Sequence, residues 1–286
     1  MKDLLPFRHV DVFSDRPYAG NGLIVVFGGV ENAADRLLAV AQELRQFETI
    51  FVEEPHDDVG VEARIFTVEE ELPFAGHPVI GAAAALHERL ASDEGERQWT
   101  FQIAGRSVAV TSSCHGDYFA ATMNQGKPLV LRTVDGVQRS EFATALGLHE
   151  RDLLPCPMQV ISTGLPYLIV PVTTQGLERA HVAVRDLERR LGIVDAKFVY
   201  ILDPAVPEGR TWDNVGAVED IATGSAAGPV AAYLVQQGRM NASADVALHQ
   251  GRFLGRPSVI NVKRLSNGDL LVRGAVAPVA TGTIAI

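Results

Sequence analysis

The sequence has no long run of hydrophobic residues. Its two longest apolar stretches, 79–86 and 226–235, consist mainly of small side chains. A helix that spans a bilayer needs about 20 apolar residues, so neither stretch is long enough. The start of the chain also lacks the basic segment and apolar segment of a secretory signal. We therefore expect a cytoplasmic protein with no membrane partner.

Positive charge is scarce as well. The chain has 25 lysines and arginines against 35 aspartates and glutamates, a formal net charge of −10, and no basic stripe. Nucleic acids and anionic surfaces attract basic proteins, so we expect no nucleic-acid partner. An acidic chain can still bind an acidic metabolite, because local dipoles and a few cations decide that binding.

Residues that hold metals and nucleotides are few or badly spaced. Neither cysteine, Cys114 or Cys156, belongs to a CxxC pair, and the eight histidines show no HxH or HExxH spacing. No GxGxxG or GxxxxGK[ST] loop occurs, and the sequence around Ser225 is not a GxSxG elbow. We therefore expect no metal site, no nucleotide cofactor and no serine-hydrolase triad.

What the sequence does contain is a repeat. Segments 64–86 and 210–234 each run from a strand-like stretch through acidic residues into a glycine turn and a small-residue helix. Gly76 corresponds to Gly224, 148 positions further on, and four other pairs are separated by 149 to 152 positions. This order indicates a duplication. We expect an N-terminal half, 1–125, and a C-terminal half, 126–275, with 276–286 as a strand that could rejoin the first half.

Each half is expected to be an α+β unit made mostly of strands. Segment 32–46 is typical of an amphipathic helix that begins near Asn32 and Asp35. The helices after the glycine turns have no polar face, which predicts that each is buried on every side. We therefore expect two pseudo-symmetric halves, each a curved, barrel-like, mostly antiparallel sheet around a central helix. The predicted strands are 10–13, 23–27, 49–53, 61–67, 98–103, 107–111, 118–123, 160–162, 167–172, 198–202, 259–262 and 270–272.

The starts of the two central helices are candidate anion sites. The first amide N–H groups of a helix have no intrahelical partner, and they lie at its positive end. Gly76 and His77 mark one start, and Gly224 and Ser225 mark the other, with Thr223 or Ser225 able to cap it. Both could hold a substrate carboxylate; the alternative is that they are capped helix starts with no ligand.

Two carboxylates near these starts are candidate catalytic groups. Glu48 lies between Phe47 and the apolar run 50–52, and Asp220 lies just before the second glycine turn. Burial among apolar groups raises the pKa of a carboxyl, which suits a base that later acts as an acid. The position matching Glu48 in the second half is Lys197. A surface carboxylate at a strand end remains the alternative for Glu48.

Other polar and aromatic residues are ambiguous. His77 could donate a hydrogen bond to a substrate or only cap its helix. Tyr18, Tyr167 and Trp212 are interpreted as packing residues.

Several motifs in one order resemble the PhzF-like phenazine-biosynthesis family, distant relatives of diaminopimelate epimerase. The resemblance covers nearly the whole chain. It rests on Asp11-Val-Phe, Ala19-Gly-Asn21, Glu48-Thr-Ile-Phe-Val, Pro73-Phe-Ala-Gly-His77-Pro, Ser162-Thr163-Gly164-Leu-Pro, Glu219-Asp220-Ile-Ala-Thr-Gly-Ser225, Gln250-Gly251 and Gly255-Arg-Pro-Ser258.

The resemblance implies a diaminopimelate epimerase-like fold with the active site between the halves, a homodimer, and no metal or organic cofactor. It implies that Glu48 is the base and that His77 and Asp220 are catalytic partners. The substrate-binding residues that we infer are Asn21, Gly76, Thr163, Gly164, Gly224 and Ser225.

Four positions depart from the family pattern and leave the substrate open: Gly22, Phe47, Ile221 and Trp212. Ala75 and Ala222 stand near the turns where diaminopimelate epimerase has cysteines, which disfavours a two-thiol racemase. We expect a cofactor-independent isomerase that moves a proton on a small carboxylate-bearing metabolite. The alternatives are a two-base amino-acid racemase or epimerase, and an inactive metabolite-binding protein on the same scaffold.

Overall fold

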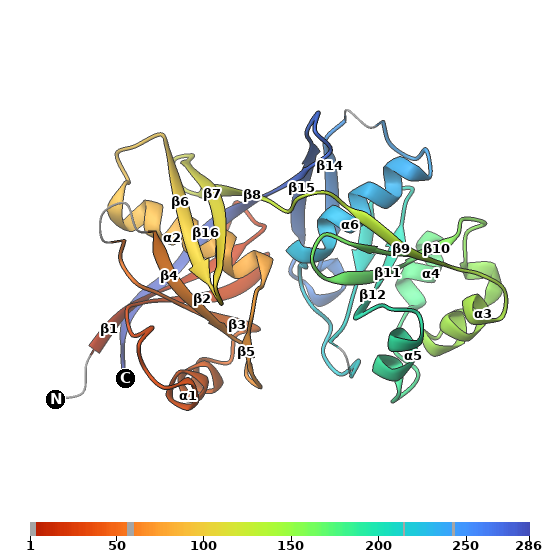
Figure 1. Cartoon of the computed structure of the whole chain (residues 1–286), viewed down its shortest axis with the longest axis horizontal. Helices are drawn as coiled ribbons and strands as arrows, with labels where there is room; N and C mark the ends of the chain where they lie inside the picture. Colours follow the sequence, from red (N-terminus) through yellow and green to blue (C-terminus); the bar gives the residue numbers. More distant parts are fainter. Residues whose placement is uncertain (1–3, 56–59, 214, 242–243) are drawn as a thin grey trace. The chain divides into compact units, whose positions relative to one another are not determined.

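The computed structural model describes residues 4–55, 60–213, 215–241 and 244–286, and it divides the chain into two compact units (Figure 1). Unit 1 contains Met1–Asn124 and Arg273–Ile286, and unit 2 contains Gln125–Val272. The last strand therefore begins in unit 2 and runs on into unit 1.

Unit 1 is a mixed sheet that closes on itself. The strand order runs β1-β2-β3-β4-β6-β7-β8-β16, and β16 also pairs with β1, which completes the ring. Most neighbours are antiparallel, but β2 and β3 are parallel, as are β4 and β6. The elements are β1 (Leu4–Val12), β2 (Asn21–Phe27), α1 (Ala34–Leu44), β3 (Glu48–Val52), β4 (Val61–Phe66), β5 (Glu71–Leu72), α2 (Gly76–Leu90), β6 (Glu96–Ile103), β7 (Arg106–Cys114), β8 (Phe119–Asn124) and β16 (Leu270–Ala285).

Helix α2 is the central helix of unit 1. Residues 76–87 are all buried, and the helix packs against strands on several sides of the ring. Its small residues allow this close packing. At Gly81 a Cβ atom would lie 2.4 Å from Leu23 and 2.9 Å from Val12, so a larger residue would push these strands outward. The prediction of a central buried helix is confirmed here.

Helix α1 covers the outer face of the unit 1 sheet. Leu37, Val40 and Ala41 pack in a cluster with sheet residues such as Phe51. The predicted helix is confirmed, with its first residue at Ala34, between Asn32 and Asp35; the Asn32 amide does not cap it and donates to the carbonyl oxygen of Gly29.

Unit 2 repeats the plan with an open order of strands. From the first residues of β16 the order continues β15-β14-β13-β12-β11-β10-β9. Helix α6 packs against β10, β11, β14 and β15, and residues 226–234 are buried. The elements are β9 (Leu129–Val134), α3 (Gly136–Ala145), β10 (Met158–Ser162), β11 (Pro166–Pro171), α4 (Thr174–Arg179), α5 (Leu187–Ile193), β12 (Phe198–Asp203), β13 (Glu208–Arg210), α6 (Gly224–Gln236), β14 (Val246–Gln250) and β15 (Ser258–Arg264), with 3-10 turns at Glu150–Asp152 and Arg252–Leu254.

Three helices cover the outer face of the unit 2 sheet. Buried residues of α3, α4 and α5, such as Phe142, Leu177 and Leu191, pack against sheet residues in one cluster. The apolar patterns of these short helices were too brief to predict them. The α+β fold class predicted from the sequence is nevertheless confirmed, since each unit is a mixed sheet with a central helix.

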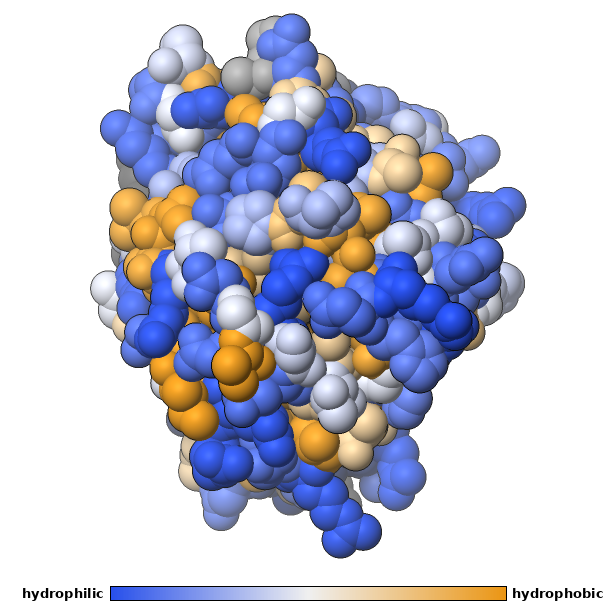
Figure 2. Space-filling view, turned by 90° about the vertical axis from the view of Figure 1, so that its right-hand side faces the viewer, coloured by the Kyte–Doolittle hydropathy of each residue, from blue (hydrophilic) through white to orange (hydrophobic). Residues whose placement is uncertain are grey.

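The surface of the described residues carries scattered apolar side chains. On the face drawn in Figure 2, hydrophobic residues lie in several separate groups among hydrophilic ones. None of the helices in the described part of the chain combines the length and the apolar character that crossing a membrane requires.

Candidate active site

Glu48 is the first residue of β3, in unit 1. Its exposed fraction is 6%, and the strand that it starts is buried throughout. The apolar run that follows Glu48 enters the barrel wall beside β2, where Glu48 pairs in register with Leu23. Glu48 is therefore a buried carboxylate and not a surface residue.

His77 is the buried partner of Glu48. The His77 Nδ1 atom lies 2.8 Å from Glu48 Oε2, and the two side chains are 5% and 7% exposed. The separation is that of a close ion pair. An acid and an imidazole are thus held together away from water, which is an arrangement suited to proton transfer.

The pair lies at the N-terminus of α2. The preceding residue, Ala75, has an extended backbone and offers no side-chain cap, and Pro78 has no N–H group. No described residue accepts a hydrogen bond from the Gly76 N–H group. The positive end of the helix is therefore available to an anion.

Asn21 is the other candidate residue in unit 1. It is fully buried at the start of β2, two residues before the strand partner of Glu48. The preceding loop is held by Asp11, whose carboxylate accepts a 2.6 Å hydrogen bond from the backbone N–H of Tyr18. Tyr18 itself is 77% exposed, so the prediction that it is a packing residue is wrong.

In unit 2, Asp220 lies just before the start of α6. Its exposed fraction is 8%, and its Oδ2 atom accepts a 2.5 Å hydrogen bond from the Thr223 hydroxyl. Thr223 occupies the N-cap position, but its side chain makes no capping bond to the helix. The prediction of a Thr223 side-chain cap is therefore wrong: the hydroxyl donates to Asp220 instead.

The remaining candidates of unit 2 gather around the first turn of α6. The Ser225 hydroxyl lies 2.6 Å from the Tyr167 hydroxyl. The Gln125 amide donates to the Gly224 carbonyl oxygen at 2.8 Å, and Thr163 donates to the same Gln125 side chain at 3.4 Å.

Gly164, by contrast, is exposed in the loop between β10 and β11. Its N–H group donates to the Ser162 hydroxyl at 3.0 Å. No described residue accepts from the N–H groups of Gly224 or Ser225.

Three residues that contact the candidate site were not predicted from the sequence to be functional. Tyr167 was predicted to be a packing residue, and its ring is indeed buried, but its hydroxyl contacts Ser225. No local sequence pattern marks Gln125 as functional. A pattern does mark Gln250: β14 alternates buried and exposed residues, and the alternation places this glutamine on the buried side.

The part of the chain that the structure describes contains no cluster of three or more His, Cys, Asp or Glu side chains that could hold a metal ion.

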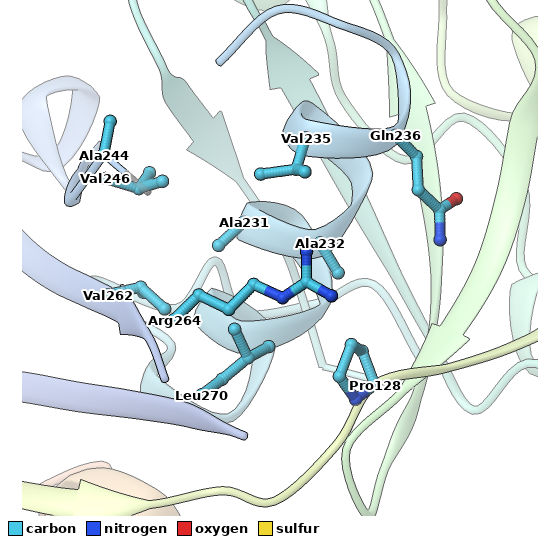
Figure 3. Close-up of a pocket in the computed structure, with 10 residues that line it drawn as sticks. All are labelled: Pro128, Ala231, Ala232, Val235, Gln236, Ala244, Val246, Val262, Arg264 and Leu270. Carbon is cyan, nitrogen blue, oxygen red and sulfur yellow. The ribbon is translucent and has the colours of Figure 1, made fainter. Parts of the chain in front are cut away.

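A small cavity of about 80 Å³ lies along the C-terminal half of α6 (Figure 3). Its walls are mostly apolar, from Ala231 and Val235 to Val262, with the Arg264 side chain beside them. None of the candidate residues lines it, so the cavity is separate from the candidate site.

Solved structures show which class of protein this fold defines. A predicted epimerase from Pseudomonas aeruginosa superimposes with a TM-score of 0.92 and 47% identity, covering 98% of this chain and 99% of that one. A hydroxyproline epimerase from Agrobacterium vitis has a TM-score of 0.60 at 13% identity, covering 100% of this chain and 94% of its own, and so shares the fold alone. The chain therefore shares its fold with a predicted epimerase and with a hydroxyproline epimerase.

The chain belongs to the phenazine biosynthesis-like (PhzC-PhzF) family, whose pattern matches residues 10–282. The trans-2,3-dihydro-3-hydroxyanthranilate isomerase of Pseudomonas chlororaphis is 30% identical over 94% of this chain and 93% of its own length. The uncharacterized isomerase YddE of Escherichia coli K12 is 32% identical over 89% of this chain and 88% of its own. The chain is an isomerase, as the sequence predicted.

Proposed function

We propose that this protein is a cofactor-independent isomerase that moves a proton between two carbon atoms of a small carboxylate-bearing metabolite. The observation that carries the proposal is the buried Glu48–His77 pair at the N-terminus of α2, with a nitrogen-to-oxygen separation of 2.8 Å. A buried carboxylate in this setting can accept a proton from one carbon atom and, as the protonated acid, donate a proton to another.

In the proposed reaction, Glu48 takes a proton from a carbon next to an activating carbonyl or diene. The electron pair of the broken C–H bond shifts into that conjugated system, and the protonated Glu48, whose acidic proton exchanges with solvent, donates a proton to a different carbon. Substrate and product then have the same atoms and the same oxidation level, so no co-reactant is needed. His77 stabilises the charge that changes on Glu48 during the transfer.

Each central helix, within its own unit, offers free N–H groups at its start to an anion such as a substrate carboxylate. The N–H groups of Gly76, Gly224 and Ser225 have no described acceptor, and each lies at the positive end of its helix. The substrate class is inferred from the relative named trans-2,3-dihydro-3-hydroxyanthranilate isomerase, since the compound in that name carries a carboxylate and is the first candidate substrate. Amino acids are the second class of candidate substrate, since they also carry a carboxylate.

Exchange of substrate hydrogen in heavy water tests the proposal. Wild-type protein should convert trans-2,3-dihydro-3-hydroxyanthranilate or a related acid and place deuterium on the carbon that receives the proton. Glu48→Gln should fold normally and lose at least 1,000-fold in turnover, near the upper range for one acid–base group. Glu88→Gln is the matched control, because Glu88 is a second glutamate of unit 1, on the same helix as His77, and pairs with Arg8 at 2.8 Å.

Three outcomes would contradict the proposal. A fully active Glu48→Gln variant would remove the base. Deuterium confined to one stereocentre, with inversion, would indicate a racemase. Tight binding of the acid with no turnover and no exchange would indicate a metabolite-binding protein.

A further inference from the structure

Gln250 is the last residue of β14 and is 1% exposed. A glutamine side chain is rarely buried unless its amide is fully hydrogen-bonded. The next residue, Gly251, has a φ of 83°, and a Cβ atom there would lie 2.7 Å from the Ile221 carbonyl oxygen. This glycine therefore lets the end of β14 approach the segment that carries Asp220.

The Gln250 side chain makes four hydrogen bonds, all within unit 2. Its Nε2 group donates to the Asp220 carbonyl oxygen at 2.9 Å and to the Thr223 hydroxyl at 3.0 Å. Its Oε1 atom accepts from the Thr223 N–H at 3.2 Å and from the Tyr200 hydroxyl at 3.1 Å. An amide has two donors and two acceptor sites, so every one is used.

These bonds fix the directions of the protons at the start of α6. The Thr223 N–H can only donate, so it requires the oxygen of Gln250, and the nitrogen must then face Asp220. Because that nitrogen donates to the Thr223 hydroxyl, the hydroxyl proton points to Asp220 Oδ2, 2.5 Å away. Burial, and then the charge of Asp220, raise the pKa of Tyr200 well above its ordinary value, so Tyr200 remains a donor.

We propose that Gln250 is a positioning residue for substrate binding, an inference that rests on the proposed function. Its amide holds the Asp220 carboxylate in the accepting role and occupies the Thr223 N–H. Only the next N–H groups, those of Gly224 and Ser225, are then left for the substrate carboxylate. Gln250 touches no reacting atom; it acts through Asp220 and Thr223.

Steady-state kinetics of Gln250→Met test the role, with trans-2,3-dihydro-3-hydroxyanthranilate as the substrate. Methionine keeps the length of the side chain but makes none of the four bonds. A loosened carboxylate site weakens ground-state and transition-state binding alike, so KM should rise about tenfold while kcat stays within threefold. A purely structural role would lower the active fraction, and hence kcat, with KM unchanged. Gln159→Met, on β10, is the matched control and should leave both constants unchanged.

Amide hydrogen exchange gives a second readout that does not depend on turnover. In Gln250→Met, the Thr223 amide and the first turn of α6 should exchange at least tenfold faster than in wild type, and the Gln159→Met control should not differ. If Gln250→Met fails to fold, Thr223→Val removes the central hydroxyl, and Thr223→Ser retains it. Thr223→Val should then raise KM and Thr223→Ser should not.

The possible outcomes distinguish a failure of the proposed isomerase function from a failure of the proposed role of Gln250. An inactive wild type would count against the proposed function, and amide exchange would still decide whether Gln250 braces the helix start. An active wild type with unchanged KM in Gln250→Met, or unchanged exchange at Thr223, would overturn the role of Gln250 alone.

Discussion

Arg64 in unit 1 and Arg210 in unit 2 make the same set of contacts. Arg64 donates two 2.7 Å hydrogen bonds to Glu71, and Arg210 donates two 2.7 Å hydrogen bonds to Glu219. In both cases the remaining nitrogen donates to two backbone carbonyl oxygens, and the guanidinium lies over the aromatic ring two positions further along the chain. In each unit the glutamate of this ion pair lies five residues before the glycine that starts the central helix. The shared set of contacts supports the duplication inferred from the sequence.

The two ion pairs differ in burial, so removing the arginine should lower the free energy of unfolding by different amounts. The Arg210–Glu219 side chains are each 11% exposed, whereas those of Arg64 and Glu71 are 23% and 37% exposed. Removing one partner of a buried pair leaves an uncompensated charge. Arg210→Met should therefore lower the free energy of unfolding by about 3 kcal/mol, and Arg64→Met by about 1 kcal/mol or less. Urea denaturation of both variants checks this; equal losses would contradict it.

The contact between Tyr167 and Ser225 predicts a kinetic effect without a loss of fold. Tyr167→Phe keeps the buried ring and removes the hydroxyl that lies 2.6 Å from Ser225. The Ser225 hydroxyl is then free to turn away from a bound carboxylate. One hydrogen bond is worth about 0.5–1.5 kcal/mol, so kcat/KM should fall between about twofold and tenfold. Tyr118→Phe, whose ring stacks on His115, is the control and should leave kcat/KM unchanged.

The sequence was sufficient for the central elements of the fold. Helices α2 and α6 were predicted because an apolar run with no polar face has only one stable place, inside a sheet. Helices α4 and α5 have 6 and 7 residues, which is too short for a helical period to stand out. Strand β9 was also missed: Leu129, Val130 and Leu131 are all exposed, so they show no alternation of buried and exposed residues.

The candidate site was predictable residue by residue but not as a network. Glu48 and His77 were identified from their motifs, yet only the fold shows that their side chains are 2.8 Å apart. The hydroxyl of Tyr167 and the amide of Gln250 act across separations of 58 and 27 residues, to Ser225 and to Thr223. Such contacts depend on which strands become neighbours, and no local pattern in one sequence encodes that.

Two glycines in helices of unit 2 should respond oppositely to alanine. At Gly228 in α6, a Cβ atom would lie 2.4 Å from the Gln125 side chain and 3.2 Å from Thr163. Gly228→Ala should therefore destabilise the protein by about 1–3 kcal/mol through overpacking. At Gly192 in α5 a Cβ atom would meet no atom within 4 Å apart from its chain neighbours and the nearby backbone of its own helix, so Gly192→Ala should stabilise the protein by about 0.5–1 kcal/mol. Thermal denaturation checks both, and a stabilising Gly228→Ala would show that Gln125 moves freely.

The environment of Asp152 predicts how the stability of the fold depends on pH. It is 3% exposed, and its carboxylate accepts hydrogen bonds from the His149 N–H at 2.9 Å and from Arg179 at 2.7 Å. Burial acts to raise the pKa of Asp152, but the His149 N–H and the Arg179 guanidinium outweigh it, and the pKa is lowered. A lowered pKa in the folded state means that the ionised group stabilises the fold above its unfolded pKa of about 3.9. This contribution is lost as the pH falls through the lower, folded-state pKa.

Asp152→Asn should therefore reduce the free energy of unfolding at pH 7 by about 1–3 kcal/mol. The difference from wild type should shrink steadily below about pH 4, because wild-type Asp152 then becomes protonated as well. Urea denaturation at pH 7, 4 and 3 measures the difference directly. Asp186→Asn is the control: the pKa of Asp186 is also lowered, by Arg190 and Arg189, but these pairs are at the surface, where solvent screens them, so its effect should be small at every pH. A difference that is the same at pH 7 and pH 3 would mean that Asp152 stabilises the fold through its shape and not its charge.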